Sequence, residues 1–256
     1  MINALTSFWS TDRALSLLLV FLCCVIFVVV PLRELHVLGR FFLGASFSLL
    51  LVSGVLAVRR DVFTTVLVGT LVVASLAVRW TKLALGLPAL EAWDALFSLV
   101  ACAVLAAVVT VRVFRAGPIT SQRIQGAIAV YLLLGLIWAF AYDLVEFMRP
   151  GAFLPAPGAA PERFCHFVYF SFIALTTVGF GDITPADPVA RSLASLEALV
   201  GQLFPAILLA RLVSMGAMYE TAARHASAAD EESRESATGE RREDGRAAGA
   251  AQRERQ

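Results

Sequence analysis

Charged residues are scarce in this chain. They make up 16% of its 256 residues, whereas 59% of the residues are hydrophobic. A soluble domain is usually about 45–50% apolar and about 25% charged, so a single soluble core could not bury this much apolar surface. The formal net charge is only +1 and no basic face stands out, which argues against a nucleic-acid partner.

Residues that build metal sites and enzyme centres are also few. The chain has three histidines and four cysteines, and their spacing matches neither a metal site nor a disulfide framework. Three of the cysteines lie in apolar runs, where a thiol behaves as a small hydrophobic group. A catalytic cluster of His, Asp or Cys is missing as well. We therefore expect a protein that is not an enzyme and that needs no organic cofactor or catalytic metal.

What the chain has instead is six long apolar runs. Each run is long enough to cross a bilayer as a helix, at a rise of about 1.5 Å per residue. Only helices or closed barrels satisfy the backbone in lipid, and these runs are too long and too uniform for barrel strands. The sequence therefore predicts an all-α membrane protein with six transmembrane helices, at residues 14–31, 35–58, 62–78, 93–114, 124–147 and 189–218.

The basic residues favour one orientation in the membrane. If both termini are cytoplasmic, the inner ends hold Arg59, Arg60, Arg112, Arg115 and Arg123, and the outer ends hold Arg33, Arg79 and Lys82. The positive-inside rule favours this arrangement. The first run lacks the basic flank and the cleavage site of a signal peptide, so we interpret it as a retained helix. We predict a multi-pass protein of the cell membrane, surrounded by lipids, with both termini in the cytoplasm.

A segment too short to span the bilayer lies between the fifth and sixth runs. Residues 150–161 are rich in Gly, Ala and Pro and are typical of an outer loop. Residues 162–175 are apolar and aromatic, and they follow a proline suited to a first helical turn. This is the length of a re-entrant half-helix. The next residues are Thr176, Thr177, Val178, Gly179, Phe180, Gly181 and Asp182.

These seven residues suit the dehydration of a cation. Backbone carbonyl groups from several strands can replace the water shell of potassium, provided that successive carbonyls point inward. Glycine reaches positive φ at little steric cost, which accounts for Gly179 and Gly181, and Thr177 can add a hydroxyl at the inner end. Irregular backbone at this depth is tolerated only where it lines a path for water or ions. The half-helix would also direct its negative C-terminal end toward the cavity below the filter.

The segment resembles the signature Thr-Val-Gly-Tyr/Phe-Gly-Asp of the potassium channel family, in the pore-loop superfamily. The resemblance covers residues 124–214. It implies a potassium-selective channel in which K+ is the permeant ion. It also implies a selectivity filter at Thr176–Asp182, with K+ held at Thr177, Val178, Gly179 and Phe180. One such segment cannot enclose an ion, so four chains around a fourfold axis, a homotetramer, are implied.

The segment departs from the family pattern in the residues that could hold the filter in place. Phe180 stands where many members have tyrosine, so the hydroxyl that could tie the filter to the half-helix is absent. The half-helix offers Tyr169, Phe170 and Ile173, with neither a tryptophan pair nor an acid to face Asp182. In the family this aspartate braces the filter or tunes its outer mouth. We expect a filter held by packing more than by hydrogen bonds.

Four residues of the sixth run are candidates for gating or support. Gly201 lies where the family commonly has a hinge glycine, and Pro205 should weaken the helix one turn later. Gly201 could equally serve close helix packing. Glu197 is an acid inside an apolar helix, which favours a functional role. It could attract cations to the cavity or, as we prefer, accept hydrogen bonds behind the filter from Thr176 or Ser171. Gln202 could face the cavity or bond to a neighbour.

The rest of the chain suggests a scaffold and a tail. A voltage sensor needs a ladder of arginines, but the fourth run has only Arg112 and Arg115, at its inner end. We predict a four-helix N-terminal domain at residues 1–118, a pore domain at 119–218 with outer helix, pore helix, filter and inner helix, and a largely disordered cytoplasmic tail at 219–256.

Two other functions remain as alternatives. A non-selective cation channel of the same fold would differ in its reversal potential. An ion-coupled transporter subunit would need paired acids within the membrane or interrupted spans in related halves, and the sequence shows neither.

Overall fold

The computed structural model describes residues 15–35, 39–58, 62–113, 121–155, 160–211 and 213–214. The predicted tail at 219–256 lies outside these ranges, and so do Arg115 and residues 156–159 of the outer loop. In the described part, five helices are long and apolar enough to cross a membrane. The all-α membrane fold expected from the apolar runs is confirmed, and the chain is a multi-pass membrane protein.

The helices follow the predicted runs closely. The first helix, Leu15–Arg33, contains the π-helical turn η1 (Val25–Val29) and continues as α2 (Val30–Glu34). It is followed by α3 (Arg40–Val58), α4 (Val62–Leu85), the 3-10 turn η2 (Pro88–Leu90), α5 (Glu91–Val113), α6 (Ser121–Met148), α7 (Ala160–Leu175) and the helix Pro188–Arg211. In α3 the apolar stretch among the described side chains is the shorter Gly44–Val55, so a count of six spans stays a prediction.

Two helices extend beyond their predicted ends. The first passes through Pro31, where Val30 N–H bonds to Val25 O in the π-helical pattern. This wider turn accommodates the proline, whose ring crowds the preceding turn and which has no N–H to donate. α4 continues past Val78 because Arg79 and Lys82 both pair with Asp94 of α5, at 3.1 and 2.5 Å. Charges that were expected to end the helix are instead paired, and that of Arg79 is buried.

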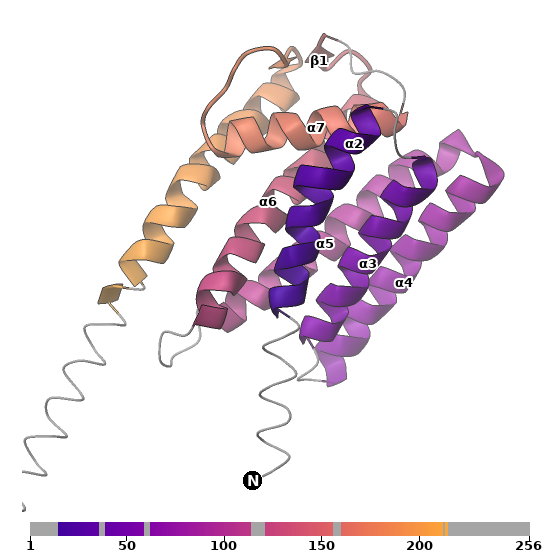
Figure 1. Cartoon of the computed structure of the whole chain (residues 1–256). Helices are drawn as coiled ribbons and strands as arrows, with labels where there is room; N and C mark the ends of the chain where they lie inside the picture. The colour runs from indigo at the N-terminus through magenta and orange to yellow at the C-terminus, as the bar shows by residue number, and fades with distance from the viewer. Residues whose placement is uncertain are drawn as a thin grey trace, which may run out of the picture. The chain divides into compact units, whose positions relative to one another are not determined.

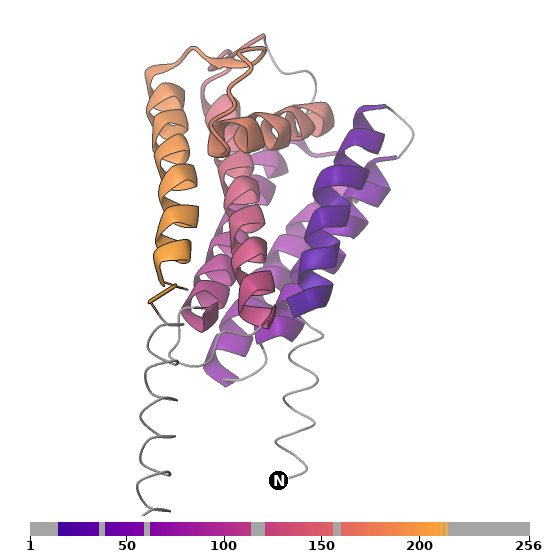
Figure 2. The ribbon, with the colours of Figure 1, turned by 60° about the vertical axis from the view of Figure 1, so that its left-hand side comes forward.

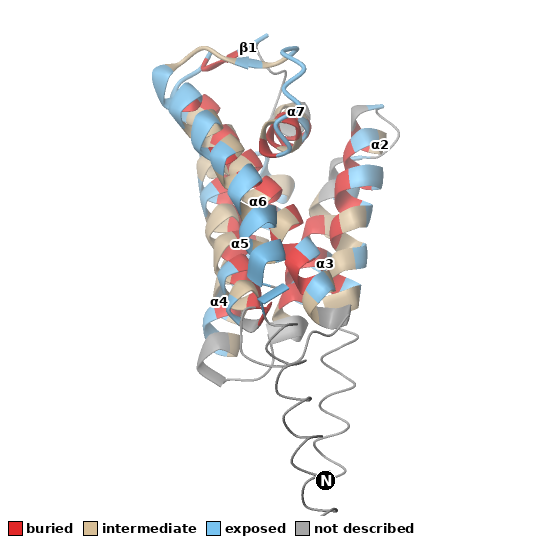
Figure 3. Ribbon diagram, turned by 90° about the vertical axis from the view of Figure 1, so that its left-hand side faces the viewer, coloured by how far each residue is buried: buried red, intermediate tan, exposed pale blue. Residues whose placement is uncertain are grey.

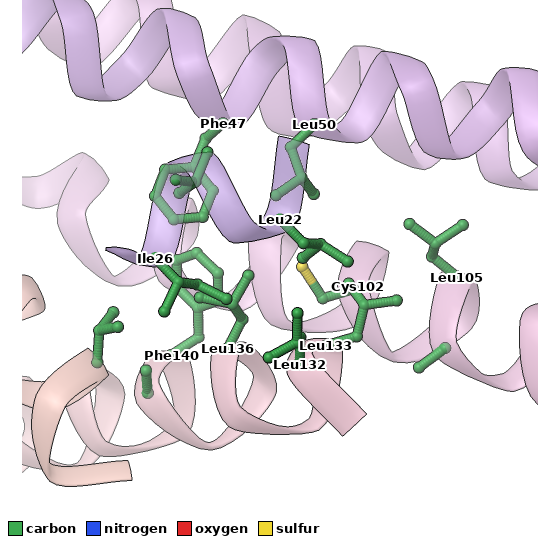
Figure 4. Close-up of a cluster of buried hydrophobic side chains, with 14 of the residues drawn as sticks. Leu22, Ile26, Phe47, Leu50, Cys102, Leu105, Leu132, Leu133, Leu136 and Phe140 are labelled. Atoms are coloured by element: carbon green, nitrogen blue, oxygen red, sulfur yellow. The ribbon is translucent and has the colours of Figure 1, made fainter. Parts of the chain in front are cut away.

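The N-terminal helices pack on α6 of the same chain. Helix α5 packs along α6, α3 and α4 pack on α5, and α7 lies across one end of α6 near α2 (Figures 1 and 2). Apolar side chains from four elements meet in one core, shown in Figure 4, among them Leu22, Phe47, Leu105 and Leu136. Burial is concentrated on the facing sides of these helices (Figure 3). The pore segment is therefore built on a scaffold supplied by its own chain.

A short antiparallel pair ties the loop after α6 to the segment after the filter. β1 (Phe153–Leu154) pairs with β2 (Thr184–Pro185), with Phe153 opposite Pro185. The Phe153 side chain is fully buried and its ring lies 4.8 Å from that of Phe167 in α7. Glu146 accepts hydrogen bonds from the N–H groups of Gly151 and Phe153. The segment that leaves the filter is thus anchored to the outer end of α6.

Candidate ion-conduction site

Every second residue of the filter, from Thr177 to Gly181, has a positive φ. Thr177, Gly179 and Gly181 have φ values of 58°, 55° and 80°. The positive φ expected for the two glycines is confirmed. Thr177 was not expected to adopt this conformation, which costs a β-branched residue about 1–3 kcal/mol and persists only where the surroundings hold it. The surroundings of Thr177 therefore have to supply this support.

The end of α7 holds the filter by its amide groups. Thr177 N–H donates to Ala174 O at 2.9 Å, and the N–H groups of Val178 and Gly179 both donate to Ile173 O at 2.9 and 3.1 Å. In a planar trans peptide the carbonyl points opposite to the N–H. The carbonyl groups of residues 176–178 therefore point away from α7. The C-terminal carbonyls of α7, expected to face the cavity, bond to the filter instead.

Gln202 supports the inner end of the filter. Its Nε2 donates to Thr177 Oγ1 at 2.7 Å, and that hydroxyl donates to Thr176 O at 2.7 Å. The Thr176 hydroxyl in turn donates to Phe172 O at 2.6 Å. These bonds hold the Thr177 side chain and so help to keep its backbone at a positive φ. Of the two roles considered for Gln202, the hydrogen bond to a neighbour is the one observed.

Tyr169 supports the outer end of the filter. Its hydroxyl donates to Asp182 Oδ2 at 2.7 Å, and the other oxygen of Asp182 accepts the N–H of Ile183 at 3.1 Å. The expectation of a filter held more by packing than by hydrogen bonds is therefore wrong at both ends. From the sequence, an acid or a tryptophan was expected as the partner of Asp182. The hydroxyl of Tyr169 can donate a hydrogen bond equally well.

Removing the Tyr169 hydroxyl should weaken the outer end of the filter. Tyr169→Phe is expected to cost about 1 kcal/mol per subunit, since Asp182 loses its donor from α7. Single-channel open times in symmetrical potassium should shorten severalfold. Tyr131→Phe is the matched control, because the Tyr131 hydroxyl makes a longer bond of 3.3 Å to Leu175 O. Open times in Tyr169→Phe that equal those of the unmodified protein would contradict this role.

Glu197 lies behind the filter, fully buried between three helices. Ser171 Oγ of α7 lies 2.5 Å from Glu197 Oε1, and the Tyr142 hydroxyl of α6 donates to Oε2 at 2.5 Å. Ser171 Oγ is also 2.7 Å from Gly135 O. This geometry supports the structural role that we preferred, with Ser171 as a partner. Thr176, the other candidate donor, bonds to Phe172 O instead.

Gly201 provides a close contact between the helix Pro188–Arg211 and the end of α7. A Cβ atom placed on Gly201 would lie 1.8 Å from Leu175 O, so only glycine fits. Pro205 has no N–H for the carbonyl of Gly201, four residues earlier, which leaves that turn with one bond fewer. The contact supports the packing role of Gly201, while hinge motion at Gly201 or Pro205 stays a prediction.

The structure brings most of the candidate residues together and adds Tyr142. Glu197, Gly201 and Gln202 all contact α7 or the filter, and Tyr142 joins them from α6. Tyr142 was missed, although a tyrosine inside an apolar helix usually has a partner for its hydroxyl. Within the described ranges, no group of three or more His, Cys, Asp or Glu side chains could hold a metal ion.

Comparison with known proteins gives matches concentrated on this region. A family model described as "Ion channel" matches residues 127–217. Protein LctB of Bacillus caldotenax is 32% identical over 108 residues, which cover 41% of this chain and 80% of that protein. Protein LctB of Geobacillus stearothermophilus is 33% identical over 86 residues, or 32% of this chain and 62% of that protein. No solved structure gives a significant match.

A named potassium channel also matches. The inward rectifier potassium channel Kirbac3.1 of Paramagnetospirillum magnetotacticum is 35% identical over 78 residues, which cover 29% of this chain but only 23% of that protein. The residues matched by the family model, 127–217, include the filter segment. The chain belongs to the potassium channel family of pore-loop ion channels.

Proposed function

We propose that this ion channel is selective for potassium and conducts K+ passively across the cell membrane. The observation that carries the proposal is the peptide geometry of residues 176–179, whose N–H groups are bonded to α7. This orientation turns the carbonyl oxygens of Thr177 and Val178 away from α7, where they could replace the water shell of an ion. We assign the K+ positions to Thr177, Val178, Gly179 and Phe180.

The working channel in this proposal is a homotetramer. In the single chain Val178 and Phe180 are 54% and 72% exposed, so one filter segment forms only one wall of an ion path. Four such walls around a fourfold axis would enclose the ion. Leu196, Leu199 and Leu203 form an exposed apolar stripe on the helix that follows the filter. This stripe suits contact with other subunits and with lipid.

The orientation proposed for the chain places both termini in the cytoplasm. The ends of α4 and α6 nearest the filter then face outward, together with β1 and β2. The positive-inside rule supports this arrangement. The C-terminal end of the helix Pro188–Arg211 then lies on the inner side, as expected for an inner helix.

Selectivity is tested by the reversal potential of the purified protein. In planar bilayers with potassium on one side and sodium on the other, we expect currents that reverse close to the potassium equilibrium potential. The control is the same bilayer without protein. A reversal potential near zero would replace the proposal by a non-selective cation channel. Substrate-coupled flux without unitary currents would point to a transporter subunit.

A further inference from the structure

The first turn of α7 carries a cation in an electrostatically unfavourable place. Arg163 lies in the fourth position of α7, near the positive end of the helix dipole, where acidic residues are preferred. Its side chain is only 14% exposed. A buried arginine at this end of a helix requires compensation from neighbouring carboxylates.

Two carboxylates from two other helices supply that compensation. Arg163 Nε donates to Asp143 Oδ1 of α6 at 2.6 Å, and Arg163 Nη2 donates to Glu91 Oε2 of α5 at 3.4 Å. Two neighbouring nitrogens of one guanidinium thus hold two different helices. A lysine at this position offers a single point charge and cannot reproduce the arrangement. Glu91 is also the first residue of α5, where a negative charge is favourable.

The same end of α5 is tied to α4. Asp94, one turn after Glu91, pairs with Arg79 at 3.1 Å and with Lys82 at 2.5 Å. The start of α5 therefore links the N-terminal helices on one side to α7 on the other. Among the described residues, the ion pair between Glu91 and Arg163 joins α5 to α7.

The other end of α7 holds the filter. α7 has 16 residues, or about 24 Å of helix at 1.5 Å per residue. The carbonyls of Phe172, Ile173 and Ala174 at its end accept the N–H groups of residues 176–179. A rigid helix fixed at both ends transmits a shift of its first turn to the filter.

We propose that Arg163 is a positioning residue of the filter. Because Arg163 is paired with Glu91, the position of α5, and with it that of the N-terminal helices, helps to determine whether the filter conducts. This inference rests on the proposed function, because it assigns a regulatory input to that filter. The N-terminal helices act here on the pore segment of their own chain. This link does not depend on a voltage-sensing ladder of arginines, because Glu91 of α5 acts directly on α7.

The test is a double-mutant cycle measured as open probability in symmetrical potassium. Glu91→Gln removes one charge while keeping the size of the side chain. We expect it to lower the open probability about fivefold, the equivalent of about 1 kcal/mol for a partly exposed ion pair. Arg163→Lys should lower it by at least this factor, because it also disturbs the pair with Asp143. The double variant should be no worse than Arg163→Lys alone, because Glu91→Gln removes a contact that Arg163→Lys already lacks.

Lys82→Gln is the matched control. It removes a charge from the other half of the cluster, leaves Asp94 paired with Arg79 and keeps both ion pairs of Arg163. Its open probability should stay within about twofold of the unmodified protein, because Asp94 keeps its ion pair with Arg79. A normal open probability in Glu91→Gln, or effects that multiply in the double variant, would overturn the inference.

A second readout separates this inference from the proposed function. The thiols of Cys165 in α7 and Cys102 in α5 are both buried and belong to no disulfide. In a background with Cys23→Ser and Cys24→Ser, Glu91→Gln should raise the labelling rate of Cys165 by a thiol reagent several-fold and leave that of Cys102 unchanged. An unmodified protein without potassium current would refute the proposed function alone. Unchanged labelling of Cys165 would then refute the tie between α5 and α7.

Discussion

Replacing Gly201 with alanine is expected to abolish the assembled, conducting channel. The new Cβ would lie 1.8 Å from Leu175 O and 2.7 Å from the carbonyl carbon of Leu175. Both partners are backbone, so no side-chain rotation relieves the overlap and a helix has to move. Alanine is favoured over glycine in a helix by about 1 kcal/mol, but overpacking of this kind costs about 3 kcal/mol or more. The clash therefore outweighs the gain.

The displacement should spread to the filter. Gln202 follows Gly201 directly and holds Thr177 by a hydrogen bond of 2.7 Å, so moving the helix away from Leu175 removes the support of Thr177 as well. Potassium flux into liposomes and the mass of the detergent-solubilised assembly, measured by light scattering, should both be lost.

Gly69 in α4 offers a control for the substitution itself. No atom lies within 4 Å of a Cβ placed on this residue, so Gly69→Ala should leave flux intact and stabilise the helix by up to about 1 kcal/mol. If Gly201→Ala assembled and conducted like Gly69→Ala, the close contact with Leu175 would not be required, and a hinge role for Gly201 would gain support.

Replacing Glu197 with leucine is expected to destabilise the region behind the filter by about 1–3 kcal/mol per subunit, the cost of a buried polar group without a partner. The Tyr142 hydroxyl donates to Glu197 Oε2 and is buried, so it loses its acceptor. Ser171 loses less, because Gly135 O lies 2.7 Å from its Oγ. Thermal unfolding in detergent, followed by circular dichroism, should show a lower midpoint for Glu197→Leu.

A second substitution identifies the cause. Tyr142→Phe removes the orphaned hydroxyl, so Glu197→Leu combined with Tyr142→Phe should be more stable than the sum of the two single effects predicts. Simple additivity would contradict the hydrogen-bond account.

Glutamine at position 197 separates the structural role from a role in attracting cations. Its amide oxygen can accept from Tyr142, and its amide nitrogen can donate to Ser171, whose hydroxyl is then free to donate to Gly135 O. Glu197→Gln should therefore conduct almost normally. A large fall in conductance at low salt, where screening is weak, with stability unchanged, would show that the charge itself serves the permeant ion.

Helix ends show where sequence reasoning was adequate. Apolar runs located every helix and most helix ends, since lipid requires an uninterrupted, internally bonded helix. The prediction erred at Pro31 and at Arg79, where a residue that usually ends a helix is accommodated. A π-helical turn accommodates the proline, and Asp94, 15 residues further along the chain, neutralises the arginine.

The filter segment and its supports differ in how far sequence could determine them. Gly179 and Gly181 were placed correctly because positive φ is a local demand that favours glycine. The partners of Asp182, Thr177 and Glu197 lie between 13 and 55 residues away. Each partner was available in the sequence as an ordinary tyrosine, glutamine or serine, without a spacing that singles it out.

The sequence by itself determined the membrane-spanning helices and the position of the filter. The length of an apolar run and a requirement for positive φ are both properties of contiguous residues. The tertiary structure alone decided that Gly201 must be small, that Tyr142 holds Glu197 beside the expected Ser171, and that Arg163 joins α5 and α6 to α7. Such contacts depend on how helices that are distant in sequence cross. That crossing is set by the packing of many side chains at once, which no single motif encodes.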